Sequence, residues 1–332
     1  MPRGERRGHL VAPICAVALL AGCGATGPSD PTPSPSGSIG AEISADAVAE
    51  LLPNDLEAET YWGMDRSAWE ELKQDAMSLP WRVVSAAGVE QAVTCIGQCA
   101  PTVVYLDGFE APAAPNWSQA AVAQSESNRV CLFDRPGMGL SPYRAGSAPH
   151  STPEQHAQEM LDMLSVLGEP GPYLLVPWSY GGLVARAASA LHPEQVAGMV
   201  LVDATSPLQP GLDEPWNGEN GFIDTDTIAG TVGEDFGMGD RPVIVLQAGQ
   251  ADEDTPPDFQ QTWNDLQRQA ATISDNSVHA VVDESDHAIP VRNPAAVVAA
   301  TTAVAGSIRA GNTDLPPCPD GLAAAGVTCT KE

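Results

Sequence analysis

One serine in this chain lies where an apolar run gives way to a pair of glycines. Residues 173–188 read YLLVPWSYGGLVARAA, and Ser179 stands between the apolar run and Gly181–Gly182. The pattern predicts a buried strand, a sharp turn and a helix, which would present the serine hydroxyl above the sheet. The helix N-terminus beneath it favours developing negative charge. Ser179 is therefore a candidate nucleophile, and the alternative is a serine that caps an ordinary helix.

A serine nucleophile needs a base, because its hydroxyl attacks poorly at neutral pH until an imidazole accepts its proton. His287 is the best-placed histidine. It follows the last strand-like run in VVDESDHAIPVRNP, just before a helical stretch. Weaker candidates lie in loops, in helices or inside a strand: His150, His156, His192 and His279.

Taken together, these segments resemble the α/β-hydrolase superfamily from about residue 81 to residue 309. The resemblance is carried by PTVV at 101–104, DRPGMGLS at 134–141 and SYGG at 179–182. The family's G-x-S-x-G turn reads PWSYG here, so Pro177 replaces the first glycine, and proline is tolerated at a strand end. The resemblance implies an α/β-hydrolase fold with a mostly parallel eight-stranded sheet flanked by helices.

The resemblance also implies an acid that sets the tautomer of the histidine. In the family this acid follows a strand as G-x-x-D, and GQAD at 249–252 matches that pattern. We therefore predict a triad of Ser179, His287 and Asp252, in the family's nucleophile–acid–histidine order. Asp254 remains an alternative, and so does Asp203, which follows the preceding strand.

Backbone N–H groups of Phe109 and Tyr180 are implied as the oxyanion hole. Many relatives have a His-Gly pair before the first of these donors, whereas this chain has Asp107–Gly108. A carboxylate there would oppose an oxyanion unless it is turned away or paired. We expect Arg135 to be its partner.

The rest of the chain supplies alternating strands and helices. Short apolar runs typical of buried parallel strands begin near residues 101, 129, 172, 196, 242 and 277, and helices are predicted over 153–168, 181–192 and 294–309. The insertion at 205–240, before the acid-bearing strand, is too short for a large helical lid. Candidate pocket-lining aromatic residues, each equally explained by core packing, are Phe109, Trp117, Trp178, Trp216 and Phe222.

The N-terminus has the features of a targeting segment. A basic start and an apolar run lead to LAGC at 20–23, which resembles the lipobox of bacterial lipoproteins. We therefore expect a signal peptide at 1–22, lipidation of Cys23 and a Pro/Ser/Gly-rich tether at 23–40. An ordinary secretory signal is the alternative. A helical extension at 41–80, the hydrolase domain at 81–310 and a tail at 311–332 complete the predicted organisation.

Cysteine usage agrees with export to the bacterial cell envelope. On proximity alone we expect Cys95 to pair with Cys99 and Cys318 with Cys329, which leaves Cys131 as a buried free thiol. A zinc site is the alternative, although no histidine lies near these cysteines in sequence.

The net charge of −28 excludes nucleic acid as a partner. It indicates a well-solvated surface or, alternatively, selection for a cationic substrate. No dinucleotide, phosphate-loop or HExxH motif occurs, so we expect no cofactor or metal, a small-molecule substrate, a membrane contact through Cys23 and a monomer. The resemblance implies hydrolysis of a small or medium ester, less readily an amide. The alternatives are a catalytically silent surface binding lipoprotein, or a lyase or cofactor-free haloperoxidase on the same scaffold.

Overall fold

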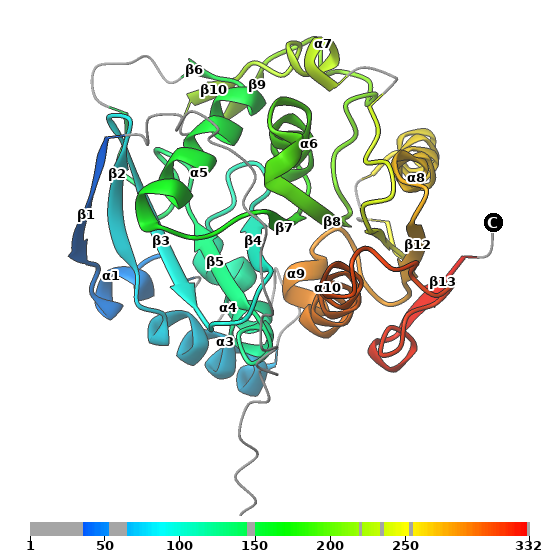
Figure 1. Cartoon of the computed structure of the whole chain (residues 1–332), viewed down its shortest axis with the longest axis horizontal. Helices are drawn as coiled ribbons and strands as arrows, with labels where there is room; N and C mark the ends of the chain where they lie inside the picture. Colours follow the sequence, from blue (N-terminus) through cyan, green and yellow to red (C-terminus); the bar gives the residue numbers. More distant parts are fainter. Residues whose placement is uncertain are drawn as a thin grey trace, which may run out of the picture.

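The computed structural model describes residues 36–52, 65–144, 150–218, 221–232, 236–251 and 255–330. In this part of the chain one twisted sheet has ten strands in the order β1-β2-β3-β5-β4-β7-β8-β11-β12-β13 (Figure 1). The strands are β1 (Gly37–Glu42), β2 (Arg82–Ala86), β3 (Val89–Ile96), β4 (Thr102–Leu106), β5 (Arg129–Phe133), β7 (Tyr173–Pro177), β8 (Val196–Val202), β11 (Val243–Ala248), β12 (Ser277–Val282) and β13 (Val327–Cys329).

The centre of the sheet is parallel and its edges are antiparallel. Strands β5, β4, β7, β8, β11 and β12 pair in parallel, whereas β1, β2, β3 and β13 join by antiparallel ladders. The central strands are buried almost throughout, as expected for strands covered on both faces. The predicted α/β-hydrolase fold is confirmed, with β1 and β13 extending the predicted eight-stranded sheet to ten.

Helices cover both faces of the sheet (Figure 1). One face packs against α5 (Pro153–Leu167) and α6 (Gly181–Leu191), and the other against α4 (Ala113–Gln124) and α10 (Pro294–Arg309). Helix α3 (Arg66–Ser78) packs on α4, and α8 (Pro257–Ala270) packs beside β11. The predicted helices at 153–168, 181–192 and 294–309 are therefore present, while the sequence analysis did not identify α4 and α8.

Helix α5 illustrates how local sequence sets these boundaries. The side chain of Thr152 accepts a hydrogen bond from the backbone N–H of Gln155, and Pro153 occupies the first turn. At the other end Gly168 has φ of 70°, a left-handed conformation that glycine adopts readily and that ends the helix.

The N-terminal part differs from the predicted extension. Strand β1 occupies residues that the sequence analysis assigned to the tether and to a helical segment, and it pairs with β2. The short helices α1 (Ala45–Ala49) and α3 account for helical structure after it. In the described residues no helix is both long and apolar enough to cross a membrane.

The insertion after β8 forms a small substructure rather than a lid of long helices. Strand β10 (Gly221–Ile223) pairs with β6 (His150–Ser151) on one side and with β9 (Trp216–Gly218) on the other, and α7 (Ile228–Val232) follows (Figure 1). This placement brings Trp216 against Phe109 and Tyr180, which follow β4 and β7.

One of the two predicted disulfides is wrong. Cys318 pairs with Cys329 as expected, but Cys95 pairs with Cys131 and not with Cys99. Cys95 and Cys131 are directly opposite each other in the antiparallel β3–β5 ladder, with Cα atoms 4.2 Å apart. Cys131 is therefore not a free thiol.

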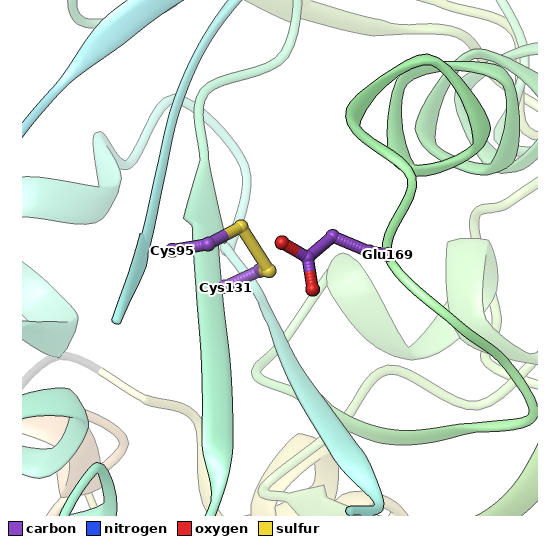
Figure 2. Close-up of side chains that lie close together, drawn as sticks. All are labelled: Cys95, Cys131 and Glu169. Carbon is purple, nitrogen blue, oxygen red and sulfur yellow. A yellow bond between two sulfur atoms is a disulfide. The ribbon is translucent and has the colours of Figure 1, made fainter. Parts of the chain in front are cut away.

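The carboxylate of Glu169 lies beside the Cys95–Cys131 disulfide (Figure 2). Arg129 Nε donates to both oxygens of this carboxylate, at 3.0 and 3.2 Å, and Arg129 Nη1 also donates to the carbonyl of Cys95. Because the sulfurs are joined and the carboxylate is paired, this cluster fastens β3 to β5 and does not offer a set of free metal ligands.

Candidate active site

Ser179 lies on a sharp turn between β7 and α6. Its φ is 51°, a left-handed value that is rare and costly for a residue with a side chain. A Cβ atom added to Gly181 would lie 2.7 Å from the carbonyl oxygen of Leu106, so only glycine allows the helix to begin this close to β4. Pro177 ends β7 without disrupting the ladder, because the N–H of Trp178 donates to Leu106 instead.

His287 follows β12 and is held by a carboxylate and an indole. Its Nδ1 lies 2.7 Å from Oδ2 of Asp203, so Nδ1–H donates and Nε2 is the nitrogen left for other contacts. The Nε1–H of Trp178 donates to the carbonyl oxygen of His287 at 2.7 Å, which fixes the loop. The rings of Trp178 and Trp263 lie 5.4 and 5.6 Å from the imidazole.

Asp203 comes directly after β8 and is almost completely buried, with 2% of its surface exposed. Its Oδ1 accepts the N–H of Ala248, at the end of the neighbouring strand β11. Its φ of 38° is a second left-handed conformation, and aspartate tolerates this better than most residues. One oxygen is thus held by the end of β11 and the other by the ring of His287.

The predicted triad acid is not placed by the structure. Asp252 and Asp254 lie outside the described residues. The carboxylate that the structure brings to His287 is Asp203, which the sequence analysis kept as an alternative.

The two predicted oxyanion donors flank Ser179. A Cβ atom added to Gly108 would lie 3.3 Å from Cβ of Ser179, so the loop that carries Phe109 passes directly beside the serine. In the described part of the structure, neither Phe109 N–H nor Tyr180 N–H has a protein acceptor. Two unengaged donors beside a serine hydroxyl are what stabilisation of a tetrahedral oxyanion requires.

Arg135 fastens this loop in a way that the sequence analysis did not foresee. Its Nη1 donates to the carbonyl of Asp107 at 2.9 Å and its Nη2 to the carbonyl of Gly108 at 2.6 Å. The guanidinium also stacks 4.9 Å from the ring centroid of Tyr180. The hydrogen bonds of Arg135 go to these main-chain oxygens and not to the carboxylate of Asp107, so the predicted pairing is corrected.

The carboxyl of Asp107 is buried, and burial raises its pKa well above the ordinary value, with Asp134 adding to the effect. A neutral carboxylic acid does not oppose an oxyanion. Burial thus favours the uncharged form of Asp107, which eases the expected conflict at this position.

A cavity of about 220 Å³ opens in front of Ser179. Asp203 and His287 line the same cavity, so the structure gathers all three groups at one place. The remaining lining combines aromatic rings, amides and hydroxyls from the insertion, the β11 loop and α8: Thr205, Gln209, Trp216, Ala248, Gln250, Thr255, Phe259, Gln260 and Trp263.

Only some of the predicted aromatic residues reach this cavity. Trp216 lines it, and Phe109 packs against Trp216 with ring centroids 5.5 Å apart. Trp117 is instead buried against Tyr105 in the core. The side chain of Phe222 is not described. The sequence analysis missed Phe259 and Trp263, whose spacing of four residues on an amphipathic segment could have indicated a shared helix face.

Two of the weaker histidine candidates have structural partners. His156 is buried with Nδ1 2.8 Å from the hydroxyl of Tyr180, and burial lowers its pKa well below the ordinary value. His279 contacts Thr330 and Gln247. Neither histidine lines the Ser179 cavity, whereas His287 does.

Comparison with known proteins agrees with this architecture. A family model described as alpha/beta hydrolase fold matches residues 101–228, a span that includes β4, the Ser179 turn and Asp203. A putative lipase from Acinetobacter baumannii superposes with a TM-score of 0.54 at 13% identity, covering 75% of this chain and 98% of that one. The protein has the α/β-hydrolase fold. A putative epoxide hydrolase from Pseudomonas aeruginosa shares this fold, with a TM-score of 0.55 at 16% identity over 71% of this chain and 98% of that one.

Sequence relatives of this protein cover less of the chain. A pimeloyl-[acyl-carrier protein] methyl ester esterase from Chromobacterium violaceum is 36% identical over 126 residues, which is 37% of this chain and 44% of the relative. An esterase from Mycobacterium tuberculosis is 32% identical over 109 residues, 33% of this chain and 35% of the relative. The chain thus spans less than half the length of these curated relatives.

Proposed function

We propose that this α/β-hydrolase cleaves carboxylic esters through an acyl-enzyme on Ser179, with His287 as the base and Asp203 as the acid that orients it. The proposal rests above all on one observation. A histidine already held by a buried carboxylate lines the same cavity as a serine on a strained strand-to-helix turn. The esterase names of the sequence relatives support the same reaction.

In the proposed mechanism each of these groups has one role. Because Asp203 engages Nδ1, Nε2 of His287 accepts the proton of Ser179 as its oxygen attacks the ester carbonyl. The resulting oxyanion faces the N–H groups of Phe109 and Tyr180. His287 then protonates the departing alcohol, which leaves an acyl group on Ser179. Water, deprotonated by His287, attacks this acyl group and releases the carboxylic acid and the free serine.

The cavity favours a small uncharged ester. Its volume of about 220 Å³ is below the range usual for small-molecule sites. In its described lining the rings of Trp216, Phe259 and Trp263 offer apolar contact, while three glutamines offer hydrogen bonds, and no lysine or arginine is present. Such a lining suits an ester with a short or aromatic acyl group and a small alcohol. It offers no cation that could bind a carboxylate elsewhere on the substrate.

Covalent labelling tests the nucleophile. A fluorophosphonate probe should label the purified chain at one site, and Ser179→Ala should abolish both the label and ester turnover. Ser78→Ala, at the exposed end of α3, is the matched control and should behave as the parent. Equal labelling of Ser179→Ala would reject the hydrolase assignment and favour a silent binding protein.

A substrate panel then tests the reaction class. Short p-nitrophenyl esters should be hydrolysed faster than the matching p-nitroanilides, and rates should fall as the acyl chain outgrows the cavity. Faster turnover of the anilides would identify an amidase instead.

We also propose that Cys23 anchors the protein to a membrane of the bacterial cell envelope. The support is the lipobox-like sequence alone, because residues 1–35 lie outside the described part of the structure. Cys23→Ser should move the protein from the membrane fraction to the soluble fraction, whereas Cys15→Ser, within the same apolar segment, should leave it membrane-bound. Unchanged fractionation of Cys23→Ser would reject the anchor.

A further inference from the structure

A second cavity, of about 380 Å³, lies on the other side of the segment that follows Asp203. Thr205 lines the Ser179 cavity, whereas the next residues, Ser206 to Leu208, line the second one. The far wall is formed by the end of α8 and the 3₁₀ turn η2 (Ala271–Ile273). This cavity is larger than the one at Ser179, and the proposed reaction does not use it.

Arg186, in the middle of α6, lines this second cavity with only 2% of its surface exposed. Its Nη1 donates to the carbonyl oxygens of Thr205 at 2.7 Å and Gly182 at 3.4 Å. Within the described residues, Nε and Nη2 have no acceptor, and no carboxylate forms an ion pair with this guanidinium. Burial lowers the pKa of Arg186 to about 10, so the side chain remains a cation at neutral pH.

An unpaired buried cation is costly, because its solvation is lost without a counter-charge. Two carbonyl dipoles compensate only in part and leave three N–H donors unused on Nε and Nη2. Asp275 also lines the cavity, but it is exposed and does not pair with Arg186. The site thus offers forked donors without an acceptor, the arrangement that binds a carboxylate with two parallel hydrogen bonds.

The rest of the lining indicates that the bound anion also has an apolar part. Pro207, Leu208, Phe236 and Ile273 give the cavity an apolar wall beside the guanidinium. We propose that the Arg186 cavity binds a small organic carboxylate, with its charged group on Arg186 and its hydrocarbon part against this wall. Because the chain carries a net charge of −28, the overall field repels anions and binding depends on the direct contact with Arg186.

Benzoate and benzamide are a matched pair of probes for this site, since they share a ring and differ in charge. Calorimetric titration of the full chain should show one benzoate site, with benzamide weaker by about tenfold or more. Arg186→Gln should reduce benzoate affinity by about the same factor. The measurement needs no turnover, so it stands even if Ser179 proves not to be catalytic.

Two further variants separate this cavity from the Ser179 cavity and guard against misfolding of Arg186→Gln. Leu208 is 40% exposed, so Leu208→Trp should fold and abolish benzoate binding by filling the Arg186 cavity. Phe259→Ala, in the Ser179 cavity, should retain it. Equal affinity for benzamide would overturn the proposal. So would benzoate binding that survives Leu208→Trp but is lost in Phe259→Ala.

Discussion

Two aspartates occupy equivalent positions in this sheet and have different environments. Asp107 directly follows β4 and Asp203 directly follows β8, with β7 and its serine between these two strands. Both are buried, with 3% and 2% of their surface exposed. Topology alone would therefore place a carboxylate on each side of Ser179.

The two carboxyl groups differ in their hydrogen-bond partners. Each oxygen of Asp203 accepts a hydrogen bond, one from His287 and one from the backbone of Ala248. Asp107 has an oxygen, Oδ1, that lacks a partner in the described residues, and burial raises its pKa well above normal. A carboxyl group at the end of a parallel strand thus becomes a useful anion only where neighbouring donors satisfy it. Where they do not, burial favours the uncharged form.

The largest effect should come from removing the charge at one of these aspartates. Asp203→Asn should lower kcat by a factor on the order of 10⁴, because an amide leaves His287 without the anion that orients and stabilises its charged form. Asp107→Asn should change kcat by less than about tenfold, since burial raises the pKa of Asp107 and so favours an uncharged form that the amide resembles. Steady-state hydrolysis of a p-nitrophenyl ester measures both.

Asp252→Asn completes this test, because Asp252 is the acid that sequence resemblance favoured. It should retain most of the activity. If Asp252→Asn lowers kcat as much as Asp203→Asn or more, the triad acid is Asp252, as the sequence resemblance implied.

An intermediate loss of kcat should come from changing Arg135. This residue connects the loop after β4 to Tyr180, the residue next to Ser179. Arg135→Met removes two hydrogen bonds to the loop before Phe109 and the contact with Tyr180, so both oxyanion donors lose support. Since loss of one oxyanion donor costs about 10²–10³ in kcat, misplacement should cost about 10–10². The loss should appear in kcat with KM little changed, because the oxyanion forms only after binding.

Arg144→Met is the matched control for Arg135. Arg144 is partly buried, whereas Arg135 is buried; Arg144 pairs with Glu159, and its hydrogen bonds do not reach the loop before Phe109. Arg144→Met should lower the free energy of unfolding without changing kcat. Equal losses of kcat in the two variants would show that Arg135 acts through general stability and not through the oxyanion hole.

The sequence was sufficient for the parts of the site that local pattern determines. Ser179 is marked by an apolar run followed by Gly181–Gly182, and His287 by its place after the last central strand. The acid was not determined in this way. Strands β8 and β11 are parallel neighbours, so Asp203 and Gly249, which follow them, lie at the same edge of the sheet. A sequence cannot tell which of them the histidine contacts.

Register and long-range packing explain the other differences. Cys95 and Cys131 are opposite each other only because of the β3–β5 register, whereas the wrong partner, Cys99, is nearer in sequence. Likewise, Phe259 and Trp263 become pocket residues because α8 packs beside β11 and brings them to His287. Neither fact is contained in the composition or periodicity of its own segment.

The smallest expected effect concerns Asp107 alone. It is a change in how the free energy of unfolding depends on pH. Because the folded-state pKa of Asp107 is raised, the folded protein holds this proton more tightly than the unfolded chain. The free energy of unfolding should therefore fall as pH increases toward the raised pKa. Asp107→Asn removes this dependence, so its advantage over the parent in urea titrations should grow as the pH rises above about 4, the ordinary pKa of an aspartate. Asp134, whose pKa is raised to about 6, adds a similar fall between about pH 4 and pH 6 that both proteins share. Parallel stability curves would mean that the pKa of Asp107 is not raised in the fold, and that its carboxylate beside the oxyanion loop opposes catalysis after all.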